Sequence, residues 1–250
     1  MWTYLTILFS LLLFFGLFAR KAYLYSKKFK DEPTVLATGI DESEEEDEEK
    51  IVKKRLSKDK KQEVEEAYKE GDGFLKEGND EEAIKAFVQA LAIDDNHLDT
   101  NKKLALLYLQ KQMFGAAAAL FERLAMLEDD AQHYSHLGLA LYQQSSFEEA
   151  RDAYQKAVDM DPSRPQRFVS LSQVYKAMGQ PSNAMVALNK ALEMDKENLE
   201  FLYVMADLQM TMGNFEDAKE TLNRIFNVNE NHEEAAALLK EIEKLEAGTN

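Results

Sequence analysis

The sequence contains no cysteine, and its 250 residues include only four prolines, ten glycines and one tryptophan. The absence of cysteine excludes disulfide bonds, thiol catalysis and thiolate metal sites. The scarcity of proline and glycine argues against an all-β fold, which needs frequent turns between its short strands. Acidic residues outnumber basic ones: the chain has 46 aspartates and glutamates but only 30 lysines and arginines, which gives a net charge of −16. Since duplex binding depends on clustered lysine and arginine, we expect no nucleic-acid partner.

Long apolar runs are absent except at the N-terminus, where residues 2–19 carry no charge and are rich in leucine and phenylalanine. As a helix this run would span about 27 Å, close to the hydrocarbon thickness of a bilayer. Basic residues follow the run instead of preceding it, the reverse of a cleavable signal peptide. The sequence therefore predicts a transmembrane helix over residues 1–20, with the lipid bilayer as one partner.

The positive charges just after this run predict its orientation. They are Arg20, Lys21, Lys27, Lys28 and Lys30. The positive-inside rule places them in the cytoplasm and the N-terminus outside. We expect a single-pass protein, of a bacterial inner membrane, with residues beyond 20 cytoplasmic; the opposite topology is an open alternative.

The segment between this run and the rest of the chain is strongly charged. Residues 21–49 begin with the basic flank and end in a stretch, 41–49, in which every residue but Ser43 is acidic. Such a block repels itself and stays solvated, which predicts a disordered linker. Residues 50–63 are mainly basic and predict a surface helix that runs into the following segment.

A nearly constant period organises the remainder of the chain. Five alanines recur along it at regular intervals, and each precedes a large apolar residue by four positions. The alanines are Ala83, Ala117, Ala150, Ala184 and Ala218, and the large residues are Phe87, Phe121, Tyr154, Leu188 and Leu222. Residues four apart share one helix face. A period of this length predicts stacked two-helix units.

The predicted units cover most of the chain after residue 63. They are residues 64–97, 98–130, 131–164, 165–198 and 199–232, followed by a charged capping helix over 233–247. One small residue in the first helix of each unit is expected to face the large residue of the second helix. These small residues are Gly71, Ala105, Gly138, Ser172 and Ala206.

The third unit carries the fullest motif. Its residues are Tyr134, Leu137, Gly138, Leu141, Ala150, Tyr154, Ala157 and Pro162. This pattern resembles the tetratricopeptide repeat (TPR) family. The first unit departs from the pattern at Glu70, where leucine is usual, and the second unit is one residue short. The resemblance implies an all-α, right-handed superhelix (an α-solenoid) of five helix-turn-helix repeats plus the capping helix.

The resemblance also implies a binding surface, because in this family the first helices of successive repeats line a concave groove for a peptide. The corresponding positions are Tyr68, Asp72, Leu75, Lys102, Leu106, Leu109, Ser135, Leu139, Tyr142, Val169, Gln173, Lys176, Tyr203, Asp207 and Met210. Most are apolar or aromatic, so we expect a protein or peptide segment that is apolar or amphipathic, with Tyr142, Tyr203 and Met210 exposed. The lysine and asparagine clamp of chaperone-binding members is absent.

The sequence offers no catalytic machinery. His133 and His136 are three residues apart on one predicted helix, a spacing that allows two ligands to one metal, but no third ligand is near in sequence. No glycine-rich phosphate loop and no nucleophile constellation is present. We therefore expect no enzyme, no cofactor and no metal.

The expected function is that of a membrane-anchored scaffold that recruits or assembles a complex at the cytoplasmic face. The layout is similar to that of bacterial lipopolysaccharide assembly adaptors, although their metal-binding cysteine domain is absent. Three alternatives stay open. They are an envelope assembly or translocon accessory factor with its repeats outside the cytoplasm, an enzyme subunit that uses His133 and His136, and a mitochondrial outer-membrane receptor.

Overall fold

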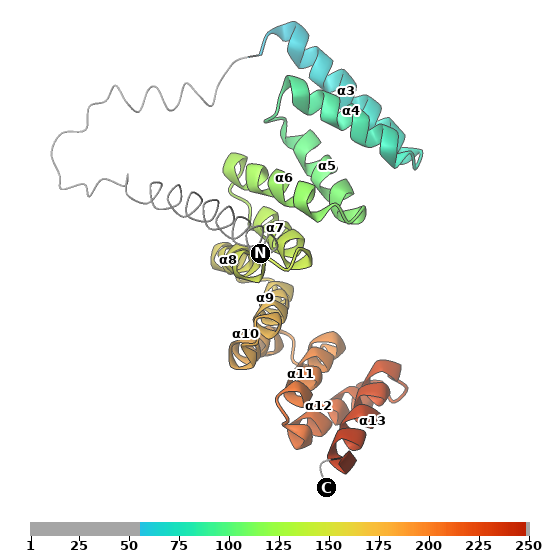
Figure 1. Ribbon diagram of the computed structural model, residues 1–250, viewed down its shortest axis with the longest axis vertical. Helices are drawn as coiled ribbons and strands as arrows, with labels where there is room; N and C mark the ends of the chain where they lie inside the picture. Colours follow the sequence, from blue (N-terminus) through green and yellow to red (C-terminus); the bar gives the residue numbers. More distant parts are fainter. Residues whose placement is uncertain (1–55, 249–250) are drawn as a thin grey trace, which may run out of the picture. The chain divides into compact units, whose positions relative to one another are not determined.

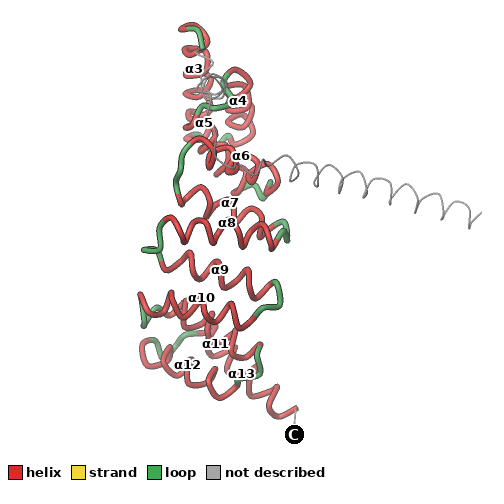
Figure 2. Tube along the Cα trace, turned by 90° about the vertical axis from the view of Figure 1, so that its left-hand side faces the viewer, coloured by secondary structure: helices red, strands yellow, loops and turns green. Residues whose placement is uncertain are grey.

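The computed structural model describes residues 56–248, which form helices and short turns and contain no strand (Figures 1 and 2). Ten helices form five antiparallel pairs, and an eleventh follows them. The pairs are α3 (Lys58–Lys76) with α4 (Asp80–Ile93), α5 (Leu98–Gln110) with α6 (Phe114–Leu127), α7 (Ala131–Gln143) with α8 (Phe147–Met160), α9 (Pro165–Ala177) with α10 (Pro181–Met194), and α11 (Leu199–Thr211) with α12 (Phe215–Val228); α13 (Glu233–Gly248) comes last.

Two predicted segments lie outside the described residues, namely the transmembrane helix over 1–20 and the linker over 21–49. Among the helices that the structure does describe, none combines the length and the apolar character needed to cross a bilayer. The basic helix expected at 50–63 is described only from residue 56. There it forms the beginning of α3, which runs without a break into the first repeat.

Local sequence signals set the helix starts. Side chains of Ser57, Asp130 and Asn198 each accept a hydrogen bond from a backbone N–H in the first turn that follows. These are preferred N-cap residues, because they satisfy one of the free donors of the first turn. Proline at the first position begins both α9 and α10, where its missing N–H leaves no bond unmade.

One left-handed residue ends the first helix of every pair. These residues are Gly78, Gln112, Ser145, Gly179 and Gly213, with φ between 58° and 77°. The next residue closes the turn; for example, the N–H of Gln180 donates to the carbonyl of Tyr175 at 2.9 Å. This is the Schellman arrangement, which satisfies carbonyls at a helix end.

The packing between paired helices confirms the predicted register. All five periodic alanines have no exposed surface, and their five large partners are at most 5% exposed. A Cβ atom added to Gly71 would lie 2.6 Å from the Phe87 ring, and one added to Gly138 would lie 2.8 Å from the Tyr154 ring. Glycine is therefore required at both positions by close approach.

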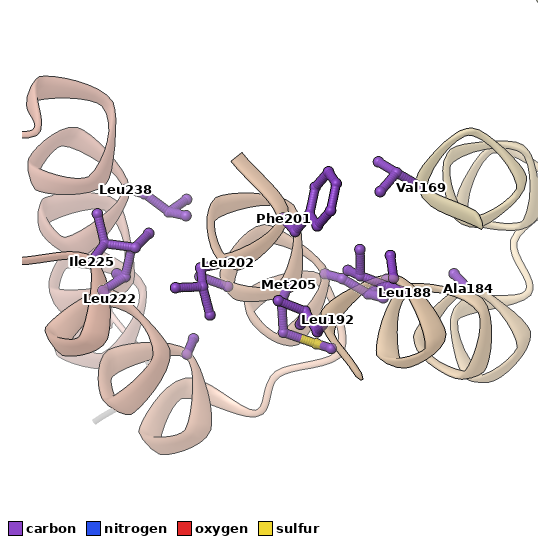
Figure 3. Packing of buried hydrophobic residues seen from close by; sticks show 14 of the residues in the cluster. Val169, Ala184, Leu188, Leu192, Phe201, Leu202, Met205, Leu222, Ile225 and Leu238 are labelled. Atoms are coloured by element: carbon purple, nitrogen blue, oxygen red, sulfur yellow. The ribbon is translucent and has the colours of Figure 1, made fainter. Parts of the chain in front are cut away.

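The apolar core passes from pair to pair and has no single centre, as expected of a solenoid. The largest cluster extends from Val158 in α8 to Ile242 in α13. Figure 3 shows its C-terminal end, where Leu238 of α13 lies beside Ile225 and Leu222 of α12. The predicted capping helix thus covers the last apolar face.

Candidate functional site

The fifteen predicted groove residues all lie on the first helices of the pairs, α3, α5, α7, α9 and α11. Side chains link several of these helices directly. Lys103 of α5 pairs with Asp72 of α3, Arg167 of α9 contacts Ser135 of α7, and Lys176 of α9 pairs with Asp207 of α11. We call the surface formed by the fifteen predicted residues the first-helix surface.

The middle of the first-helix surface is apolar. Leu106 of α5 is 48% exposed and Leu139 of α7 is 37% exposed, at equivalent positions of consecutive repeats. Leu109 and Tyr142 follow each of them by three residues and are half-buried. These four residues form the apolar centre. A patch of exposed apolar side chains marks a candidate interaction site.

An ion-pair cluster lies on the N-terminal side of the apolar centre. Asp72 contacts Lys103 and also Lys76, the latter at 2.7 Å. The hydrogen bond from Lys103, followed by that from Lys76, lowers the pKa of Asp72 to about 2. The same bond raises the pKa of Lys103. Asp72 is therefore a charged acceptor that already has two partners.

A second ion pair lies on the C-terminal side, between Lys176 and Asp207. Both residues were predicted for the groove, and the structure brings them together from neighbouring helices. Each side chain is about one-third exposed. The pair lies beyond the C-terminal side of the apolar centre, and its two opposite charges give it no net charge toward a ligand.

Lys102 and Ser135 are also held by protein partners. Lys102 Nζ lies 2.5 Å from Glu128 Oε2, and the pKa of Glu128 is lowered chiefly by this contact and then by His133. Ser135 Oγ donates to the Ala131 carbonyl at 2.9 Å and accepts from Arg167 Nε at 3.2 Å. These residues form part of the surface, and most of their hydrogen-bonding capacity is used by partners within the chain.

Some predicted residues are less accessible than we expected. Val169 has no exposed surface and cannot contact a ligand, because its side chain packs in the core cluster of the last repeats. Tyr142, Tyr203 and Met210, which we expected to be exposed, are half-buried against neighbouring core clusters. The exposed apolar residues on this surface are instead Leu106 and Leu139.

The other predicted residues contribute at the edges. Tyr68 packs on His97 with ring centroids 5.5 Å apart, and Tyr203 stacks on His232 at 6.3 Å. Burial raises the pKa of Tyr203. Leu75 is half-buried and Gln173 is exposed.

His133 and His136 have separate partners. The buried His133 ring lies 3.1 Å from Glu128 Oε2, whereas His136 stacks on Phe121 with centroids 5.0 Å apart. Burial, and then the neighbouring His133, lowers the pKa of His136. Within residues 56–248 no group of three potential metal ligands is found.

Sequence reasoning missed two residues that contact this surface, Lys103 and Arg167. Lys103 lies 31 residues after Asp72, and the same separation joins Lys176 to Asp207. A search for opposite charges at this one separation would have found both pairs. Arg167 is 7% exposed and binds both the carbonyl and the carboxylate of Asp161. No sequence signal distinguishes it from a surface arginine.

Comparison with known proteins agrees with this geometry. Two family models, each described as tetratricopeptide repeat, match residues 102–165 and 175–242, which together exceed half of the chain. The chain belongs to the tetratricopeptide repeat family. The TPR fold is that of a protein-interaction scaffold. No curated protein matches the chain significantly.

Solved structures share the TPR fold at low sequence identity. A crystal structure of MamA protein is 21% identical with a TM-score of 0.63, covering 67% of this chain and 92% of that one. YrrB, described as a TPR protein with an unusual peptide-binding site, is 18% identical with a TM-score of 0.61 over 70% and 90%. PilF of Pseudomonas aeruginosa is 22% identical with a TM-score of 0.53 over 76% and 95%. These likenesses bear on the fold alone.

Proposed function

We propose that this chain is a membrane-anchored TPR scaffold that binds an apolar or amphipathic segment of another protein and recruits it to the cytoplasmic face of a membrane. The observation that carries the proposal is the apolar centre, formed by Leu106, Leu109, Leu139 and Tyr142 on two consecutive first helices. Among the structural relatives, YrrB is described as having a peptide-binding site.

The chemistry of the surface favours an apolar ligand over a charged one. The carboxylates and ammonium groups beside the apolar centre are already engaged in pairs within the chain, namely Asp72 with Lys103 and Lys176 with Asp207. A ligand gains little by displacing such pairs, because both charges would then need new partners. Burial of Leu106 and Leu139 supplies the favourable free energy instead.

Membrane anchoring rests on the sequence. The uncharged run over residues 2–19 is long enough to cross a bilayer, and the basic residues after it favour a cytoplasmic position for the repeats. A tether of this kind would concentrate the bound segment at the membrane.

Peptide selection tests the binding. Random peptides displayed on phage are selected on the purified chain, and we expect the enriched peptides to carry apolar residues at helical or alternating spacing. Leu106→Asp and Leu139→Asp should each weaken these peptides by about tenfold or more, because a charge then faces the apolar side chain. Val88→Asp, at an equally exposed valine of α4 (46%), is the matched control. Equal affinities for all three variants would reject the apolar centre as the binding site.

Cysteine labelling tests the anchoring and topology, because the chain has no cysteine of its own. Ser57→Cys provides one thiol just before α3. We expect the chain to stay in the membrane fraction after carbonate extraction, and the thiol to react with a membrane-impermeant maleimide only after the cells are permeabilised. Release by carbonate would refute the anchor, and labelling in intact cells would refute the orientation.

A further inference from the structure

The first-helix surface continues onto α13. Tyr203 of α11 stacks on His232, the residue before α13, with ring centroids 6.3 Å apart. Glu234, in the first turn of α13, has its Oε2 atom 3.3 Å from Nδ1 of the same histidine. Glu241 follows Glu234 by seven residues, two turns along the same helix face. The C-terminal end of this surface therefore carries carboxylates from a helix that holds none of the fifteen predicted residues.

Three carboxylates gather around Tyr203. Burial raises the pKa of its phenol, and the charges of Asp207, Glu234 and Glu241 raise it further. Because nearby negative charge disfavours a phenolate, this shift agrees with the contacts that place α13 beside Tyr203. We call Tyr203 and these three carboxylates the acidic end.

Two of the three carboxylates lack a cationic partner. Asp207 pairs with Lys176, but no lysine or arginine within residues 56–248 forms an ion pair with Glu234 or Glu241. His232 does not neutralise Glu234, because its Nδ1 accepts a backbone N–H from the first turn of α13 at 3.2 Å and so carries no proton toward the carboxylate. Since Glu234 and Glu241 are both exposed, the acidic end presents a net negative charge to a ligand.

Elsewhere on the first-helix surface, lysines balance the carboxylates. At the opposite end, Asp72 contacts two lysines, Lys76 and Lys103. In the middle, α7 contains no aspartate, glutamate, lysine or arginine, and α9 contains no aspartate or glutamate. The negative charge of the surface is therefore concentrated at one end, which gives the surface a direction.

The acidic end is separated from the apolar centre by a distance that sets the length of a ligand. Contacting helices pack about 10 Å apart, and α7, α9 and α11 follow one another along the stack (Figure 2). The apolar centre on α7 and the acidic end on α11 are therefore about 20 Å apart. A bound segment spans this distance with about 13 residues as a helix or about 6 residues as an extended strand.

We propose that the segment bound by the first-helix surface is cationic and amphipathic, with apolar residues on Leu106 and Leu139 and lysine or arginine residues at the acidic end. This inference rests on the proposed function. Carboxylates alone are common on solvated surfaces, and they bear on a ligand here because they continue the surface that carries the apolar centre. Charge complementarity selects one partner and one direction over others, and the net charge of −16 attracts a cationic segment from a distance.

Designed peptides test the charge preference. Each carries one leucine face and, about 13 residues away, a tail whose four polar positions are lysine, glutamine or glutamate. Each set is made with the tail after and before the leucine face. Binding to the full chain in uncharged detergent is measured by fluorescence anisotropy, against a blank of detergent alone. In one order we expect the lysine peptide to bind at least about fivefold tighter than the glutamine peptide and about tenfold tighter than the glutamate peptide.

Salt separates this preference from apolar binding. At about 1 M salt, where the Debye length is about 3 Å, the preference for lysine should shrink. The glutamine peptide should keep its affinity, because its binding depends on apolar burial. A preference that is unchanged by salt would overturn the electrostatic cause.

Two variants locate the preference. Glu234→Gln with Glu241→Gln removes two charges from the acidic end and should remove most of the preference for lysine over glutamine. Glu148→Gln with Glu149→Gln, at exposed residues of α8, removes the same charge elsewhere and should leave the preference in place. Equal loss in both variants would show a general effect of net charge and would overturn the proposal.

Carbodiimide coupling reports the position of the tail. The reagent joins an amine of the bound lysine peptide to a carboxylate that it contacts, and we expect peptide mapping to find Glu234 or Glu241. Glu243, exposed on the same helix, is the internal control. Coupling mainly to Glu243 would overturn the proposed position.

The outcomes separate this inference from the proposed function. If the lysine and glutamine peptides bind equally in both orders and Leu106→Asp weakens both, the surface binds an apolar segment without charge selection, and this inference alone fails. If Leu106→Asp weakens neither peptide, the apolar centre is not the binding site, and both proposals fail.

Discussion

At the residue scale, a glycine of the first helix packs directly against an aromatic ring of the second helix in two of the repeats, Gly71 against Phe87 and Gly138 against Tyr154. A side chain at Gly138 meets Tyr154, whereas a Cβ atom at Gly73, inside α3, meets nothing within 4 Å. Gly138→Leu should therefore lower the free energy of unfolding by about 1 to 3 kcal/mol. Gly73→Leu should raise it by up to about 1 kcal/mol, because leucine favours the helix. Thermal unfolding of both variants checks this, and similar melting temperatures would contradict the packing of Gly138.

Asp72 gives a prediction about pH. Its hydrogen bonds with Lys103 and then Lys76 lower its pKa from 3.8 to about 2. The stabilisation from this cluster is therefore fully present above the unfolded value and is lost as the pH falls through about 2. Carboxyl NMR titration should show Lys103→Met moving the midpoint of Asp72 upward toward 3.8. Lys69→Met, which removes a pair with Glu65 on the same helix, should leave it in place. An unmoved midpoint in Lys103→Met would disprove the assigned cause.

At the scale of the element, the turn between paired helices has the same backbone conformation in all five repeats, but the residue type at its left-handed position differs. Gln112 and Ser145 adopt the left-handed conformation that glycine adopts in the other three turns. This conformation costs about 1 to 2 kcal/mol for a residue with a side chain. Gln112→Gly and Ser145→Gly should each raise the free energy of unfolding by about 1 kcal/mol in chemical denaturation. Gln110→Gly, at the last helical residue of α5, is the control and should lower the free energy of unfolding. A loss of stability in the two turn variants would contradict the prediction.

The helix pairs were predictable from sequence because their signal repeats. Alanine and a large residue four positions later mark one face of the second helix, and five copies in phase fix the register. The capping helix followed from the apolar face that the last pair leaves uncovered.

The binding surface was less predictable, because side-chain exposure depends on neighbours that the motif does not specify. Val169 occupies a groove position of the family, yet surrounding residues of α9 to α11 bury it. Lys103 and Arg167 act through partners from other repeats or turns. The carboxylates around Tyr203 likewise come from two helices, α11 and α13, and no single stretch of sequence reveals that they meet.

At the scale of the whole molecule, stability should vary along the stack. The first repeat has Glu70, exposed, where leucine is usual, and its core clusters are small. The last repeats share one cluster that continues into α13. Since each repeat contacts only its neighbours, the ends with least burial open first.

Hydrogen exchange checks this gradient. Amides in the second half of α3 should exchange at least about tenfold faster than those of α9, which belongs to a repeat with a neighbouring repeat on each side. Ile242→Ala in α13 should speed exchange in α11 and α12 with little change in α3, and Lys244→Ala, at an exposed position, should change neither. Uniform acceleration along the whole chain in Ile242→Ala would show instead that the stack opens as one unit.

The matching bounds of the last three repeats have a consequence for how such a chain lengthens. Their first helices begin at 131, 165 and 199, and their second helices begin at 147, 181 and 215, so all three repeats have the same length. Duplicating or excising one whole repeat joins the same kind of turn to the same kind of helix, so the helix spacing is kept and only the interface at the junction acquires new side-chain partners. Gene duplication can thus lengthen the stack one repeat at a time, while the residues of the first and last repeats stay unchanged.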